Sequence, residues 1–157
     1  MRTLIQRALL VTSQVDRLQP LGLLALRLYV SGVFLKSGLV KISDWGATLA
    51  LFHDVYKVPV LPPAVAAVVG AFGELAFPVL IVLGLMGRFG AAGLFVVNTM
   101  AVISYPELWS FECPAAIQSH FIWGAILIAL TLFGPGKLSI DHLVQRRIGL
   151  RPALDAA

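Results

Sequence analysis

Four long apolar segments constrain the fold of this chain more than any other feature of its sequence. They cover about residues 21–40, 62–86, 89–105 and 115–133. A helix needs roughly 20 mainly apolar residues to cross a bilayer. Charged residues make up only 13% of the chain, against roughly 25% in soluble domains, so too few remain to cover four apolar helices in water. The sequence therefore predicts an all-α integral membrane protein, a four-helix bundle that forms a single transmembrane domain over residues 1–157.

The basic residues flank these segments unevenly, and this asymmetry predicts their orientation. Lys and Arg accumulate on the cytoplasmic side of membrane proteins. One side of the four segments carries two such residues, Lys41 and Lys57, and the other side carries eight. The eight are Arg2, Arg7, Arg17, Arg88, Lys137, Arg146, Arg147 and Arg151. We therefore expect a multi-pass protein of the bacterial inner membrane with both termini in the cytoplasm, and we interpret the net charge of +4 as an orientation signal rather than as nucleic-acid binding.

Both ends of the chain carry short stretches of helical apolar periodicity. Near the N-terminus, apolar residues recur at helical spacing from Leu4 to Leu18. Near the C-terminus, Ser139 precedes Leu143, Val144 and Ile148, and serine is a preferred N-cap residue. Basic amphipathic helices lie on anionic membrane surfaces. We expect a short interfacial helix at each terminus, in contact with the lipid bilayer.

Three ionisable residues fall inside the predicted spans, Arg27 and Lys36 in the first and Glu74 in the second. Such a residue is costly in a span unless it is paired or hydrated. If the first two spans are antiparallel neighbours, Glu74 lies between the two cations in depth, so we expect it to pair with Arg27 or with Lys36. Asn98 in the third span is a further polar partner. Two interpretations stay open: a polar pocket for a substrate, a quinone head group or a proton, and a structural ion pair that fixes helix packing.

The connection between the third and fourth spans carries other reactive side chains. It brings Glu107, Glu112 and Cys113 toward His120, which lies about one turn into the fourth span. Cys, His and Glu are metal-ligand types, but their spacing here matches no familiar ligand motif, so we assign no metal. We count His120 with the candidate ligand or ion-pair cluster. Cys113 is the single cysteine, and it is either a redox thiol or a packed small residue.

The first two spans carry a pattern of polar and glycine residues in the segments Leu26–Ile42 and Gly70–Arg88. The positions of this pattern are Arg27, Lys36, Gly38, Lys41, Glu74 and Arg88. The pattern resembles the DoxX family of small integral membrane proteins. The likeness covers roughly residues 22–134. It departs from the family where two glycines often follow the Glu-Leu step, because this chain has Ala-Phe-Pro at residues 76–78.

The resemblance implies a fold similar to that of the small membrane subunit of thiosulfate:quinone oxidoreductase. It implies a membrane subunit of a redox or quinone-linked complex, at most one subunit of an oxidoreductase, with quinone as the candidate ligand and a soluble or membrane redox protein as the partner. Two alternatives stay open, a small transporter or channel for an anion or a metal, and a ligand-free assembly factor. The glycine-rich helix faces also permit a homo-oligomer.

Overall fold

The computed structural model describes residues 2–110 and 114–149, with side chains from residue 17 onward. The described residues form helices and no strand. The elements are α1 (Arg2–Ser43), α2 (Trp45–Asp54), α3 (Pro63–Leu83), α4 (Gly87–Ser104), the 3-10 helix η1 (Pro106–Trp109), α5 (Pro114–Phe133) and α6 (Ile140–Arg147). Four helical segments are long and apolar enough to cross a membrane: Arg17–Ser43 of α1, and α3, α4 and α5. The predicted all-α membrane bundle is confirmed, with four helices long and apolar enough to cross the bilayer.

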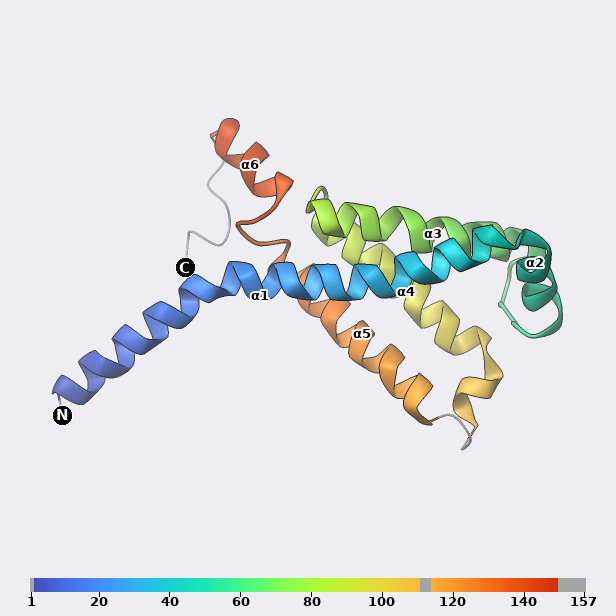
Figure 1. Cartoon of the computed structure of the whole chain (residues 1–157), viewed down its shortest axis with the longest axis horizontal. Helices are drawn as coiled ribbons and strands as arrows, with labels where there is room; N and C mark the ends of the chain where they lie inside the picture. Colours follow the sequence, from blue (N-terminus) through green and yellow to red (C-terminus); the bar gives the residue numbers. More distant parts are fainter. Residues whose placement is uncertain (1, 111–113, 150–157) are drawn as a thin grey trace.

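The N-terminal stretch is part of α1 and not a separate interfacial helix, which differs from our expectation. The helix runs without a break from Arg2 to Ser43 and contains Pro20. Proline has no N–H to donate to the carbonyl four residues earlier, and it bends a helix at that point. Figure 1 shows the N-terminal part of α1 pointing away from the bundle, while the rest of the helix lies within it.

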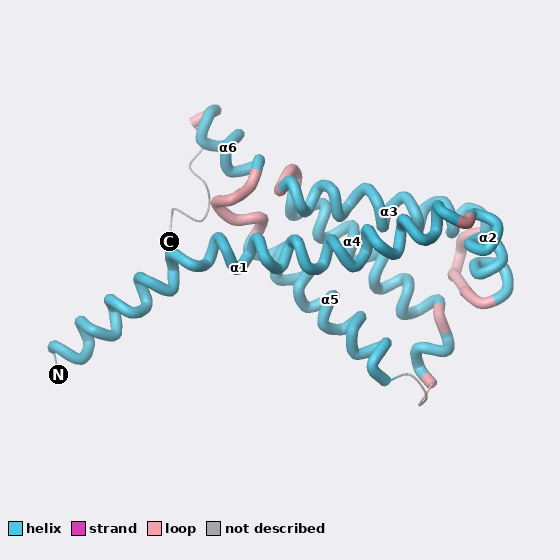
Figure 2. Tube along the Cα trace, in the orientation of Figure 1, coloured by secondary structure: helices cyan, strands magenta, loops and turns pink. Residues whose placement is uncertain are grey.

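Neighbours in the sequence are also neighbours in the bundle. Helix α3 packs against α1, α2 and α4, and α5 packs mainly against α4. The short helix α2 closes the bundle end at which α1 finishes and α3 begins (Figure 1). The α3–α4 turn and α6 lie at the opposite end, and the connections between long helices stand at the two ends of the bundle (Figure 2). Consecutive spans therefore run in opposite directions, as short connections require.

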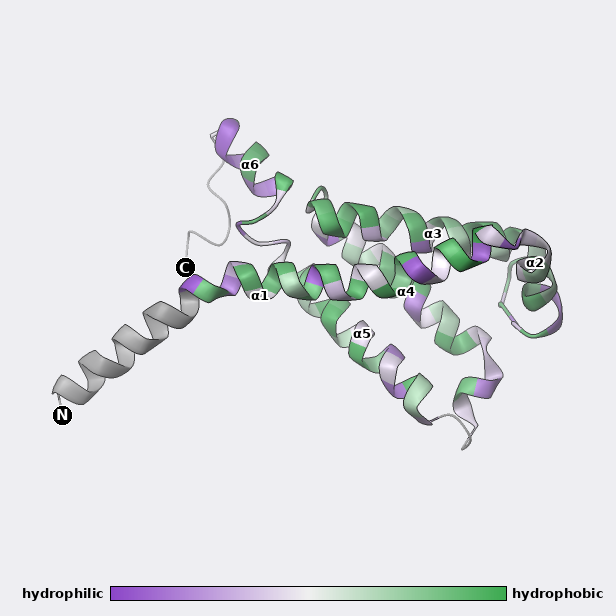
Figure 3. Ribbon diagram, in the orientation of Figure 1, coloured by the Kyte–Doolittle hydropathy of each residue, from purple (hydrophilic) through white to green (hydrophobic). Residues whose placement is uncertain are grey.

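The long helices consist mainly of apolar residues, which Figure 3 shows as green along each of them, and many of these residues are exposed. Large side chains such as Leu28, Phe72, Val96 and Ile128 are about half exposed or more. In water such a surface would cause aggregation, whereas lipid tails solvate it. Helix association in lipid then depends on close packing and on polar contacts between helices.

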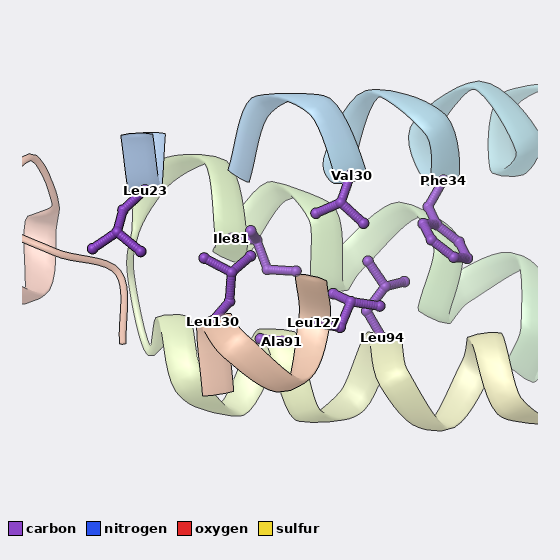
Figure 4. Packing of buried hydrophobic residues seen from close by; sticks show 8 residues of the cluster. All are labelled: Leu23, Val30, Phe34, Ile81, Ala91, Leu94, Leu127 and Leu130. Atoms are coloured by element: carbon purple, nitrogen blue, oxygen red, sulfur yellow. The ribbon is translucent and has the colours of Figure 1, made fainter. Parts of the chain in front are cut away.

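The core lies where the four spans meet, toward the α6 end. Its buried residues are Leu23, Val30, Phe34, Ile81, Ala91, Leu94, Leu127 and Leu130. Figure 4 shows these side chains converging from α1, α3, α4 and α5. Four of them, Val30, Ala91, Leu94 and Leu127, have no exposed surface. This part of the bundle is therefore closely packed with apolar side chains.

Helix α6 is fixed to the turn between α3 and α4. Asp141 accepts hydrogen bonds from the backbone N–H groups of Met86, at 2.8 Å, and Gly87, at 2.9 Å. These are unpaired donors at the start of α4, where a carboxylate is favoured. The predicted cap of α6 is confirmed, because Ser139 Oγ accepts from the His142 N–H at 3.2 Å. Leu143 remains exposed on α6, on a face suited to the bilayer surface.

Candidate functional site

Glu74 lies at the middle of α3 and is paired with Lys41 of α1. Lys41 Nζ donates to Glu74 Oε1 at 2.9 Å and to Oε2 at 2.7 Å, and it also donates to Ser37 Oγ at 2.9 Å. Only 11% of the Lys41 side chain and 10% of the Glu74 side chain are exposed. Charges as buried as these need a partner to be retained. The pair therefore ties α1 to α3 inside the bundle.

Gly38 brings the two helices close together at this pair. A Cβ atom on Gly38 would lie 2.9 Å from Leu75 Cδ2 and 3.2 Å from Glu74 Cβ. Ser37 and Lys41 are four residues apart, so they lie one above the other on a face next to Gly38. The small residue permits the close approach, and the lysine then reaches the carboxylate across the interface.

Our expectation that Arg27 or Lys36 pairs with Glu74 is wrong. Lys36 is exposed, because it lies five residues before Lys41 and so points roughly 140° away around the helix. Arg27 lies fourteen residues before Lys41, about 21 Å along the helix axis, which places it at the other end of α3. Helix α1 continues to Ser43, beyond the predicted end of the first span at residue 40, and this extension places Lys41 inside the bundle.

Arg27 is buried and donates hydrogen bonds to four backbone carbonyl groups. Its Nε donates to Ile81 O at 2.7 Å, and its Nη2 donates to Val82 O at the end of α3. Its Nη1 donates to Pro135 O at 2.9 Å and to Leu138 O at 2.7 Å, in the connection between α5 and α6. The last carbonyls of a helix lack partners within it. Arg27 therefore joins the end of α3 to the connection between α5 and α6.

Asn98 and His120 form a second polar contact, between α4 and α5. Asn98 Nδ2 donates to His120 O at 3.0 Å, and Asn98 Oδ1 lies 2.8 Å from His120 Nδ1. The His120 ring also packs edge-on against Trp123, with 4.8 Å between ring centroids. These contacts join Asn98 to His120 and not to Glu74. Within the described residues no three His, Cys, Asp or Glu side chains gather as metal ligands, and Cys113 lies outside those residues.

A cavity of about 140 Å³ begins at the Lys41–Glu74 pair and extends between α3 and α4. Most of its lining is apolar: Phe52, Val58, Leu61, Ala66, Val69, Gly70, Val96, Val97, Met100 and Ala101. Val69 is 52% exposed and Val96 is 59% exposed. Because both residues lie on membrane-spanning helices, the edge of the cavity that they form faces lipid. We call this space the α3–α4 cavity.

Two further polar side chains line the α3–α4 cavity, Ser104 and Tyr56. Ser104 is buried, and its Oγ has no hydrogen-bond partner among the described residues. A buried hydroxyl without a partner is uncommon in proteins, and Ser31 Oγ is the other such atom among the described residues. Burial raises the pKa of the Tyr56 phenol above its ordinary value of 10.0, and the charges of Glu74 and Tyr105 raise it further. The phenol is therefore neutral and able to donate a hydrogen bond.

Sequence reasoning identified Glu74 but missed three residues around it, namely Lys41 as its partner, Ser104 and Tyr56. For Lys41 a signal existed, because Ser37, Gly38 and Lys41 have the spacing of one helix face. For Ser104 and Tyr56 no local signal exists, since one ends α4 and the other lies in a connection. The packing of α4 against α3 brings Ser104 to the cavity, and the packing of α2 against α3 brings Tyr56.

The chain is similar to a known protein family and to a protein from Haemophilus influenzae. A family model described as DoxX matches residues 22–106, more than half of the chain. A Haemophilus influenzae protein described as uncharacterized is 29% identical over 130 residues, which cover 80% of this chain and 84% of that protein. No protein of known structure matches the chain. The residues that line the α3–α4 cavity, from Lys41 to Ser104, all fall within the segment that matches the family.

Proposed function

The chain belongs to the DoxX family, and we propose that it is a membrane subunit of a quinone-linked redox complex that binds a quinone head group in the α3–α4 cavity. The observation that carries this proposal is the position of the Lys41–Glu74 pair. A nearly buried ion pair forms the polar end of a cavity whose other walls are apolar. A site with an apolar body and a few convergent polar groups is typical of small-ligand binding.

The size and the opening of the cavity support a quinone. Its volume of about 140 Å³ is close to the roughly 150 Å³ of an engineered protein cavity that binds benzene, so a single ring is a suitable occupant. The lipid-facing edge at Val69 and Val96 would leave a long isoprenoid tail in the bilayer. A ligand that reaches its site from within the membrane needs no opening to water.

The polar groups match the oxygen atoms of a quinone ring. The hydroxyl of Ser104 is unpaired among the described residues and the Tyr56 phenol stays neutral, so each can donate a hydrogen bond to a carbonyl oxygen. The three N–H donors of Lys41 are held by Glu74 and Ser37, so a ring oxygen at the polar end of the cavity would take over one of these contacts. When bound, a quinone would supply two-electron chemistry, with electrons exchanged with a separate redox protein. The residues of this chain would hold the ring and exchange protons with its oxygens.

The proposal is tested by blocking the cavity edge without touching the ion pair. Val69 and Val68 are adjacent on α3 and are 52% and 54% exposed, but only Val69 lines the cavity. Each would be changed to Trp, and quinone would be extracted and quantified from protein purified in mild detergent. We expect Val69→Trp to lose the bound quinone and Val68→Trp to retain it. If the wild type carries no quinone, or if both variants keep it equally, the proposed site is wrong.

A further inference from the structure

Lys41 lines a second space in addition to the α3–α4 cavity. A groove of about 590 Å³ lies between α1 and α2, and Lys41 and Ser37 form part of its wall. The ammonium of Lys41 therefore stands between the two spaces, with Ser37 Oγ on the groove side and the Glu74 carboxylate on its other side. We call this second space the α1–α2 groove.

Polar and charged side chains form part of the wall of the α1–α2 groove, and the apolar residues Val33, Val40, Ala47 and Leu51 form the rest. Besides Ser37 and Lys41, the polar part contains Lys36, Ser43, Asp44 and Thr48. Lys36, Ser43 and Asp44 are exposed, and a free ammonium and a carboxylate at this depth require hydration. A water molecule takes up roughly 30 Å³ in the liquid, so the groove has room for several. Water in the groove would lie next to Ser37, whose hydroxyl accepts a hydrogen bond from Lys41.

Between the pair and the α6 end of the bundle, the described residues form a closely packed apolar layer. On that side α3 continues to Ile81, and the core residues Leu94 and Leu127 fill the space between the helices. These side chains are 1% exposed or less. Beyond them, Arg27 closes the bundle end with its bonds to Ile81 and Leu138. Such a closely packed apolar layer excludes water.

We propose that water and protons reach the Lys41–Glu74 pair from one side of the membrane only, through the α1–α2 groove. The titratable groups around the pair are Lys36 and Asp44 in the groove and Tyr56 on the cavity side. Among the lining residues α4 contributes no charge, only the Ser104 hydroxyl. The role of this route rests on the proposed quinone site, because protons taken up or released by the ring oxygens would then exchange with the α2 side, the predicted periplasmic side.

Thiol labelling tests this route directly. Ser37→Cys is made in a Cys113→Ala background and treated with a charged, membrane-impermeant maleimide in right-side-out and inside-out vesicles. Asp44→Cys, at the exposed mouth of the groove, reports which side the mouth faces. Gly32→Cys is the matched control on α1, because a Cβ there meets nothing within 4 Å and faces lipid. Lys36→Cys reports on the same groove should Ser37→Cys fail to fold.

We expect Ser37→Cys to be labelled only from the side that labels Asp44→Cys, and Gly32→Cys to remain unlabelled until the protein is denatured. A second measurement uses a permeant maleimide with different pH on the two sides. Because the thiolate is the reacting form, the rate at Ser37→Cys should follow the pH on the Asp44 side. Labelling from the opposite side, or no labelling at Ser37→Cys and Lys36→Cys while Asp44→Cys reacts, overturns the proposal. Neither result depends on quinone, so a failure of the quinone site remains distinguishable.

Discussion

Lys41 donates hydrogen bonds to both carboxylate oxygens of Glu74, at 2.9 and 2.7 Å. This contact joins α1 to α3 and forms the polar end of the α3–α4 cavity. The contact therefore holds two helices together, and in our proposal it also binds the quinone ring. Variants of Lys41 and Glu74 can separate these two roles.

The first prediction concerns the cost of breaking the pair. Glu74→Met or Lys41→Met alone leaves a nearly buried charge without its partner, and such losses destabilise proteins by about 3–5 kcal/mol. The double change to Met removes both charges and should recover most of that loss. Unfolding by SDS in mixed micelles, followed by circular dichroism, measures all three variants. If the double variant is as unstable as the sum of the single variants, the pair does not act as a unit.

A second prediction uses the same double variant to isolate the chemical role. If the charges matter only for packing, a stable Lys41→Met and Glu74→Met double variant should bind quinone as the wild type does. Our account expects it to fold and to lose bound quinone, because the donor at the polar end of the cavity is gone. Quinone content per mole of folded protein is the measurement. Retention of quinone at the wild-type level would leave the pair a purely structural role.

Gly38 should tolerate no large side chain, unlike Gly32 on the same helix. A Cβ at Gly38 already lies 2.9 Å from Leu75 Cδ2, whereas a Cβ at Gly32 meets nothing within 4 Å. Gly38→Val should push α1 from α3 and cost on the order of 1–3 kcal/mol, while Gly32→Val should have little effect. The same SDS unfolding assay compares them. Equal stabilities for the two variants would contradict the close approach at Gly38.

Arg27→Lys should not preserve the hydrogen bonds between residue 27 and the backbone carbonyl groups at the α6 end of the bundle. Lysine has a single nitrogen, whereas the guanidinium of Arg27 reaches four carbonyls on two segments with three nitrogens. Each hydrogen bond lost to a charged group costs about 1.5–3 kcal/mol. The free energy of unfolding in the SDS assay should therefore fall by at least that amount. Limited proteolysis should also cleave the chain near residues 134–139 sooner. A variant as resistant as the wild type would show that the fork geometry of arginine is not needed.

Tyr56 should make the protein sensitive to alkaline pH. Burial, with help from Glu74 and Tyr105, raises the pKa of this phenol in the folded state above 10.0. Its stabilising contribution is therefore complete below about pH 10 and is lost as the pH rises through the raised pKa. Tyr56→Phe should lose less stability over that alkaline range than the wild type. Thermal unfolding in detergent at a series of pH values compares them, and identical alkaline profiles would contradict the assignment.

Much of the fold could be predicted because the bilayer imposes length and polarity on each span. The apolar runs between residues 62 and 133 match α3, α4 and α5 within a few residues. Ser139 was recognisable as a cap because its hydrogen bond is local. The N-terminal helix boundary was not recognisable, because Pro20 bends α1 without ending it. A proline in a sequence does not say which of these two outcomes the packing selects.

The candidate site could be predicted only in part. Glu74 stands out because a carboxylate in an apolar span must have a partner. The identity of that partner depends on where α1 ends and on which face meets α3, and both follow from packing at Gly38. Arg27 illustrates the same limit, because its partners are backbone carbonyls that no pattern of side chains reveals. The depth of a residue along its helix limits which residues can be its partner. The rotation of the helix about its axis then decides which of them faces it.

The most direct test of the quinone site is photolabelling in native membranes with an azidoquinone, followed by mass-spectrometric mapping of the adducts. We expect adducts on the cavity-lining residues of α3 and α4, and we expect unlabelled quinone to compete them away. These residues are Ala66, Val69, Gly70, Glu74, Val96, Val97, Met100, Ala101 and Ser104. Adducts that resist competition, or that fall on lipid-facing positions such as Val79 and Ile128 as often as in the cavity, would contradict the central claim that Lys41 and Glu74 form the end of a quinone site.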